Sequence, residues 1–371
     1  MSTIDKSQMN MAFLEVLNDP TMSDSEKSAG LSKVASGIIR TYVEQEGFSG
    51  KLVPPQPLTR EQCIPTGIEG DLYVLRPIDD HKVYSVQTSR MGKPTGRYVR
   101  GKDYKINVAY RTSEEINKNT RELQDTYTYD IQDLFESRIG LSMQKLQDSI
   151  WMQLVWEGLG YNTKTGALKT GANSGSKQIY DLRSYWGTDG LSKGLTSEMF
   201  VLAIQKFASK VDPTGAASDD ISVINSHFVP NPDKPLIPIT VLMNEYDFAD
   251  LGEMPASEIG DLVKAEFFQA YNLPHIKGVQ IVRTIHMDII PRGHLYFFTS
   301  PEFIGHNFEI DPIQVITKVD SYNFEMKMKG THFAGQGIGN IFAFWQVLFT
   351  PRGESNGTYA ALTPTCPVLN V

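Results

Sequence analysis

A run of about 45 residues with apolar side chains at helical spacing is the feature that most limits what this chain can fold into. Between residues 112 and 158 apolar positions recur every three or four residues, which is the period of one helix face and not of a strand. Thr112 and Glu115 have capping-box spacing at its start, and Gly158 supplies a stop. Such a helix would be about 65–70 Å long, longer than one compact domain. We therefore expect a rod around which the other parts are arranged, with a bend or break at Gly140.

The segment just before the rod is strongly basic. Residues 81–111 alternate polar and apolar side chains around a Gly-rich and Pro-containing turn at 92–96, which predicts a long β-hairpin. This segment has eight Lys or Arg residues and one acid, although the whole chain has a net charge of −8. A lone two-stranded ribbon is marginally stable in water, so we expect it to lie on another surface. Its candidate contact residues are Arg90, Lys93, Arg97, Arg100 and Lys102.

The expected rod is acidic where the hairpin is basic. A basic ribbon and an acidic rod in one chain favour head-to-tail packing between copies, in which each hairpin reaches the helix of the next subunit. An ordinary solvated charged ribbon is the alternative. The candidate acidic partners on the rod are Glu122, Asp125, Asp130, Asp133 and Glu136.

The remaining segments divide by their local signals. Residues 1–65 read as two helices and an extended Pro-rich strap, and this arm either grips a partner or folds back on its own core. A Gly, Ser, Thr and Asn-rich stretch at 161–195 reads as an irregular crossing. Interleaved helices and strands at 195–305 indicate an α/β unit, and the stretch at 306–350 reads as β-strands.

Composition and motifs point away from catalysis. The chain has 371 residues, 40% of them hydrophobic, two cysteines, and no apolar run long enough to span a bilayer. We therefore expect a soluble protein without a disulfide framework or membrane association. The glycines at 335–339 precede a strand rather than a helix, so we interpret them as a turn and not as a phosphate cradle. His286, Asp288, His294 and His306 match no ligand spacing, so we predict no metal, cofactor or catalytic residues.

The order of these segments resembles that of the tailed-bacteriophage major capsid proteins, a fold shared with encapsulin shells. Three short segments also resemble the family: VQIVR at 279–283, IPRG at 290–293 and AFWQV at 343–347. The resemblance implies an α+β fold with the following parts: an N-terminal arm (1–65), a connector to the peripheral domain (66–80), an extended β-hairpin loop (81–111), the long spine helix and peripheral domain (112–194), an α/β axial domain (195–305), and peripheral-domain strands with the C-terminus (306–371).

The resemblance also implies a function. It predicts a structural, non-enzymatic protein that forms hexamers and pentamers of an icosahedral head around double-stranded DNA, which it would contact non-specifically. Scaffolding, portal and cement proteins would be its other partners, and it would be assembled in the host cytoplasm and located in the virion capsid. Two alternatives stay open: an encapsulin-like shell around protein cargo, and a metal-dependent enzyme using His286, Asp288 and His294.

Overall fold

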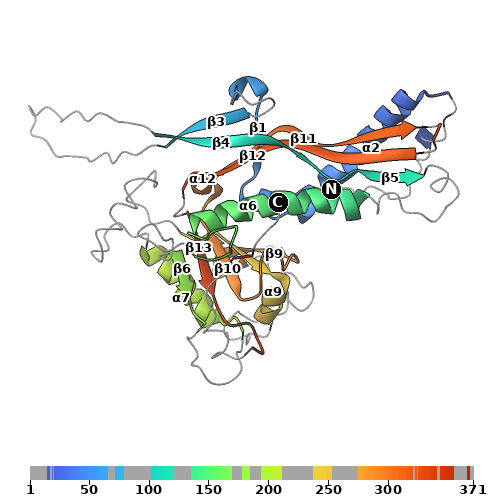
Figure 1. Ribbon diagram of the computed structural model, residues 1–371. Helices are drawn as coiled ribbons and strands as arrows, with labels where there is room; N and C mark the ends of the chain where they lie inside the picture. Colours follow the sequence, from blue (N-terminus) through green and yellow to red (C-terminus); the bar gives the residue numbers. More distant parts are fainter. Residues whose placement is uncertain are drawn as a thin grey trace, which may run out of the picture.

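The protein consists of two β-sheets with a helix between them (Figure 1). The computed structural model describes residues 15–16, 19, 21–65, 72–78, 102–119, 135–168, 178–183, 194–210, 237–252, 275–320, 322–323, 325–340, 343–354 and 366–367. Two sheets and several helices make the class α+β, which confirms the class predicted from the sequence.

The first sheet is elongated and mostly antiparallel. Its order is β1-β11-β12-β4-β3-β2, and β5 pairs with β12 beyond the end of β4. Only β1 runs parallel to its neighbour, β11, among the pairings within the described ranges. Its strands are β1 (Pro55–Pro57), β2 (Ile64–Pro65), β3 (Leu72–Ile78), β4 (Lys102–Thr112), β5 (Ile116–Asn119), β11 (Gly305–Asp320) and β12 (Glu325–Ile338).

The second sheet forms a separate lobe with the order β6-β13-β10-β7-β9-β8. Helices α7 (Ser197–Lys210) and α9 (Glu245–Gly252) pack on one of its faces through Phe200, Phe248 and Leu251. Two of its strands come from outside the 195–305 segment, one from before it and one from after it. The strands are β6 (Ile179–Asp181), β7 (Thr240–Asn244), β8 (His275–Ile276), β9 (Val279–Thr284), β10 (His294–Phe298) and β13 (Phe344–Leu348).

Helix α6 (Leu141–Gly158) joins the two sheets because it buries side chains against both. Trp151 and Trp156 are fully buried in the core on the other face of the second sheet. Met143 instead packs with α2 (Asp24–Glu46) and the first sheet. Full burial of such a side chain contributes about 1.5–3 kcal/mol, so α6 fixes the relative position of the sheets.

The rod predicted for 112–158 starts too early. Thr112 ends β4 and residues 116–119 form β5. The capping pattern was misleading because Ser113 pairs with a distant strand: its N–H donates to the Gly330 carbonyl (2.9 Å), and its Oγ accepts the Gly330 N–H (2.8 Å). Helical structure is described from the π-helical turn η2 (Phe135–Gly140), and the chain changes to α-helix directly after Gly140, where a bend or break was predicted.

The glycines at 335–339 do not form the predicted turn before the last strand. Gly335 and Gly337 lie inside β12, where the chain passes very close to β4. A Cβ at Gly335 would lie 2.8 Å from the Asn107 carbonyl oxygen, and one at Gly337 would lie 2.5 Å from Ile106 Cγ1. Glycine is present here because a neighbouring strand leaves no room for a side chain.

Three helices begin with capping hydrogen bonds between residues close in the sequence. Ser23 and Glu26 form a reciprocal capping box at α2, with Ser23 N–H donating to Glu26 Oε2 at 2.8 Å. Thr196 Oγ1 accepts the Met199 N–H at α7, and Asn244 Oδ1 accepts the Tyr246 N–H at α9. These bonds span two or three residues, so the sequence contains both partners.

Candidate assembly surfaces

The base of the basic hairpin projects from the first sheet as a two-stranded ribbon (Figure 1). Strands β3 and β4 pair from Leu72–Val108 out to Ile78–Lys102, whereas β12 pairs with β4 only at 108–112. The hairpin therefore starts earlier than the predicted residue 81, and its base is part of a seven-stranded sheet rather than a lone ribbon. A sheet of this size supplies the support that an isolated hairpin lacks.

Cations at the hairpin base lie on aromatic rings rather than on carboxylates. The Arg76 guanidinium carbon lies 4.7 Å from the centroid of the Phe308 ring, and Lys105 Nζ lies 4.3 Å from that of Tyr73. Within the described ranges neither residue forms an ion pair with a carboxylate. Cation–π contacts hold the side chains in place while leaving the positive charge uncompensated.

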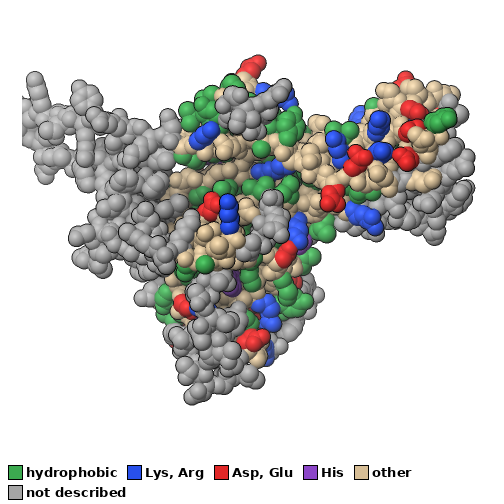
Figure 2. Space-filling view, viewed as in Figure 1, with side chains coloured by type: hydrophobic (Ala, Val, Ile, Leu, Met, Phe, Trp, Pro, Cys, Tyr) green, Lys and Arg blue, Asp and Glu red, His purple; other side chains and the backbone are tan. Residues whose placement is uncertain are grey.

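The opposite end of the elongated sheet differs in charge. Figure 2 shows Lys, Arg, Asp and Glu side chains side by side over α2 and the far ends of β11 and β12. One such pair is Lys327 Nζ and Glu325 Oε2, 3.7 Å apart. The sheet therefore has one end with uncompensated cations and one end with mixed charges.

The predicted contact residues lie almost entirely outside the described ranges. For Lys102 and Glu136 the structure gives the backbone alone, in β4 and η2. Their pairing thus stays a prediction. The residues that lie outside the description are Arg90, Lys93, Arg97, Arg100, Glu122, Asp125, Asp130 and Asp133.

The described part of the N-terminal arm packs against its own chain. β1 covers the outer edge of β11 at Asn307–Glu309, and α2 covers the same edge further along. Asp148 of α6 holds the arm between them, because its carboxylate accepts the N–H groups of Ser49 (2.9 Å) and Phe48 (3.3 Å) at the start of α3 (Ser49–Leu52). Asp148 is fully buried, and this burial raises its pKa to about 6 despite the hydrogen bonds. Of the two expectations for the arm, folding back is what these residues do.

The histidine and aspartate cluster considered for a metal is dispersed. Asp288 forms an ion pair with Lys145 of α6. His294 is half-buried, and the loss of water around its ring lowers its pKa to about 4; its Nδ1 lies 2.9 Å from Gln346 Nε2. His306 stacks between Tyr104 and Phe308. Among the described residues no three His, Cys, Asp or Glu side chains are grouped as metal ligands would be.

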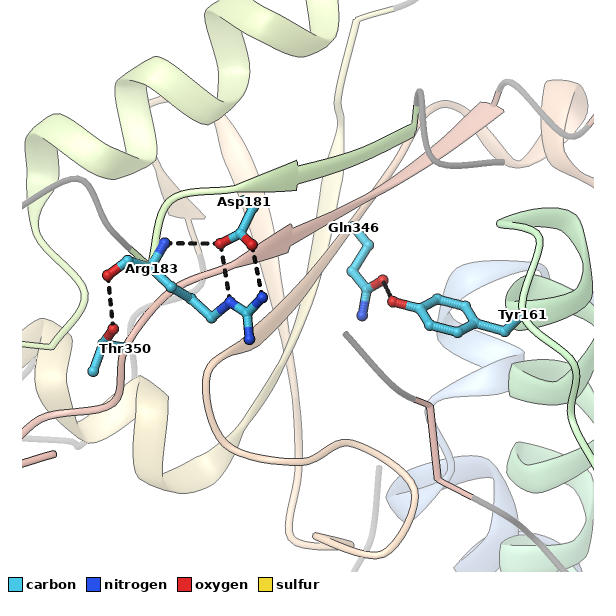
Figure 3. A network of polar contacts seen from close by, with 5 residues as sticks. All are labelled: Tyr161, Asp181, Arg183, Gln346 and Thr350. Carbon is cyan, nitrogen blue, oxygen red and sulfur yellow. Dashed lines mark hydrogen bonds and ion pairs between the residues drawn. The ribbon is translucent and has the colours of Figure 1, made fainter. Parts of the chain in front are cut away.

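Polar side chains inside the second lobe form hydrogen bonds around Gln346. Tyr161 donates to Gln346 Oε1 at 2.6 Å (Figure 3). Gln346 Nε2 in turn donates to Tyr296 at 3.1 Å. Nearby, the Asp181 carboxylate accepts three hydrogen bonds from Arg183; burial alone would raise its pKa, but these bonds lower it. Local sequence patterns do not predict the bond between Tyr161 and Gln346, since these residues are 185 positions apart.

Two tyrosines of β4 pack against other aromatic rings. Tyr104 stacks on His306, and Tyr110 stacks on Phe333 with 4.3 Å between ring centroids. In the described ranges no helix is both long and apolar enough to cross a bilayer.

Comparison with known proteins finds similarity in structure only. No family model and no curated protein matches the sequence. The structure is similar to viral capsid proteins. The capsid of cyanophage P-SCSP1u matches with a TM-score of 0.49 and 10% identity over 80% of this chain and 86% of that one. The capsid of Ralstonia phage GP4 matches with a TM-score of 0.48 and 11% identity over 81% and 87%. A virus-like particle from Pyrococcus furiosus matches with a TM-score of 0.44 and 12% identity over 85% and 98%.

Proposed function

We propose that this chain is the major capsid protein of a tailed phage, a structural subunit that assembles into hexamers and pentamers of an icosahedral head around double-stranded DNA. The observation that carries the proposal is the hairpin base. It projects from a braced sheet, and the segment beyond it, 79–101, is rich in Lys and Arg. A base supported by the sheet, followed by a segment with more Lys and Arg than acids, is suited to reach a neighbouring subunit.

The architecture of the chain supports this proposal. The parts implied by the resemblance occur in the expected order: an arm, a projecting hairpin, a central helix, and a second lobe with an α/β sheet. Helix α6 joins the two sheets through buried contacts, so both sheets pack on the same helix. The acidic side chains of 122–136 remain the proposed receptors for the hairpin, and scaffolding, portal and cement proteins the proposed partners.

Electron microscopy with light scattering tests the proposal on the protein expressed alone and with its neighbouring genes. Shells, tubes or ring-shaped capsomers are the expected result, and nuclease-protected DNA in particles from infected cells identifies a phage head. Shells that hold protein cargo instead would indicate an encapsulin-like compartment. A monomer under all of these conditions would refute the proposal.

A further inference from the structure

A groove lies between α6 and the underside of strands β4 and β12, with a volume of about 780 Å³. Its floor is a stripe of three half-buried apolar side chains spaced by four residues on α6: Leu146, Ile150 and Leu154. Residues four apart share one helix face. Figure 2 shows hydrophobic and cationic side chains exposed in the region between the strands and α6. The groove therefore offers an apolar surface next to positive charge.

Arg111 of β4 lines this groove and has no acidic partner among the described residues. Only 8% of its surface is exposed, and its buried Nη1 has no hydrogen-bond partner in the part of the chain that the structure describes. Nη2 makes one long bond, 3.4 Å, to Gln336 Oε1. The loss of water around the guanidinium lowers its pKa to about 10. A buried cation without a counter-ion is costly, and a carboxylate is its best-matched partner.

We propose that this groove binds residues 120–134 of a neighbouring copy of the chain, with a carboxylate of that segment on Arg111. The segment, TRELQDTYTYDIQDL, carries four acids and one arginine, and its leucines, isoleucine and tyrosines match the apolar floor. The inference rests on the proposed function, because it requires subunits to lie side by side. It names Arg111, the last residue of the basic segment 81–111, as a cation that the acidic segment would contact.

Chain geometry restricts how the first two acids of the segment, Glu122 and Asp125, could approach Arg111 of the same chain. In its own chain the segment begins after Asn119, which pairs with Glu325, whereas Arg111 pairs with His332. Seven strand residues separate Glu325 and His332, about 23 Å. Asp125, six residues beyond Asn119, reaches about 20 Å only when fully extended. A segment from another subunit can present any of its four acids to Arg111.

The test is the binding of a fluorescent peptide of residues 120–134 to full-length subunits, dispersed below the concentration at which light scattering detects assembly. We expect saturable binding that weakens with salt, and at least tenfold weaker binding to Arg111→Met. Arg111→Lys should fall between the two, because it keeps the charge but loses the bidentate geometry. A peptide with every Asp and Glu replaced by the amide should bind at least tenfold more weakly to the wild type.

Further variants keep the result interpretable if Arg111→Met unfolds. Leu154→Gln changes the groove floor without touching the cation and should also weaken binding. Failure of the wild type to bind, or equal binding by all folded variants, would overturn the inference. Stronger Arg111-dependent binding of a peptide of residues 4–18 would also overturn it, by assigning the groove to the arm. Shell formation is measured separately, so shells without peptide binding refute this inference alone, and binding without shells refutes the capsid proposal alone.

Discussion

The backbone N–H of Thr317 donates a 2.8 Å hydrogen bond to the Oγ of Ser32. Ser28 accepts in the same way from Val319 (3.0 Å) and Ser36 from Val315 (2.8 Å). Four helical residues advance about 6 Å and two strand residues about 6.6 Å, so serines spaced by four match every second N–H of a strand. Helix α2 thereby covers the edge of β11, which would otherwise be open to pairing with another chain.

Ser32→Ala should destabilise the folded chain by about 1–3 kcal/mol, because it leaves the Thr317 N–H without an acceptor. Urea unfolding followed by circular dichroism measures the change. Ser25→Ala is the matched control, since Ser25 is exposed on the same helix and should change stability by less than about 0.5 kcal/mol. Equal effects of the two substitutions would show that the serine ladder, the bonds accepted by Ser28, Ser32 and Ser36, does not stabilise the edge of β11.

Asp148 predicts a specific pH dependence. Its pKa is about 6 in the folded chain and 3.8 in the unfolded chain, so between these pH values the folded state holds a proton that the unfolded state has released. Stability contributed by this group is therefore present at low pH and lost as the pH rises through about 6. For this pKa shift the contribution to the free energy of unfolding is about 2–3 kcal/mol.

Asp148→Asn removes this contribution. We expect the unfolding free energy of the variant relative to the wild type to improve by about 2–3 kcal/mol between pH 4 and pH 7. Asp247, whose pKa burial raises to about 7, acts in both proteins and cancels in the difference. Parallel pH profiles for the two proteins would contradict the assignment.

Local patterns predicted local structure well and distant pairing poorly. The caps at Ser23, Thr196 and Asn244 bond within three residues, so the sequence alone contained the information. The same reasoning failed at Thr112, because the Ser113–Gly330 bonds outweighed the local capping signal. Those two residues are 217 positions apart, a distance at which periodicity gives no guidance.

Predictions about the candidate surfaces also succeeded for local features and failed for distant pairing. The basic charge of the hairpin was evident from the sequence. The burial of Arg111 in a groove was not evident, because it depends on the register between β4 and β12. The serine ladder was missed although a signal existed, namely three serines at a spacing of four in one helix. Serine at that spacing reads as a polar helix face until a strand edge is known to lie beside it.

Gly335→Ala tests the close approach of β12 and β4. The added Cβ would lie 2.8 Å from the Asn107 carbonyl oxygen, a backbone atom that moves only if the strands separate. We expect the free energy of unfolding, measured by urea unfolding, to fall by about 1–3 kcal/mol. Gly50→Ala is the control, because no atom lies within 4 Å of its Cβ position. A neutral Gly335→Ala would show that the strands adjust without cost.

Reversing the hairpin charges should weaken assembly in a salt-dependent way. The triple variant Arg90→Glu, Arg97→Glu and Arg100→Glu should assemble least well at low salt, because exposed charges are screened beyond about 10 Å at 0.1 M. Light scattering at increasing salt concentrations measures the effect. Lys51, Lys164 and Lys318 are exposed, so their reversal to Glu is a control with the same change in charge. A defect independent of salt would point to misfolding instead.

The most direct test of the capsid account compares wild-type protein with a deletion of residues 87–100 by negative-stain electron microscopy, with circular dichroism on both. The account predicts shells or capsomers tens of nanometres across for the wild type, and a folded subunit that forms neither for the deletion. Normal shells from the deletion protein would contradict the role of the hairpin between subunits. Absence of any assembly by the wild type, alone or with its neighbouring genes, would contradict the capsid function itself.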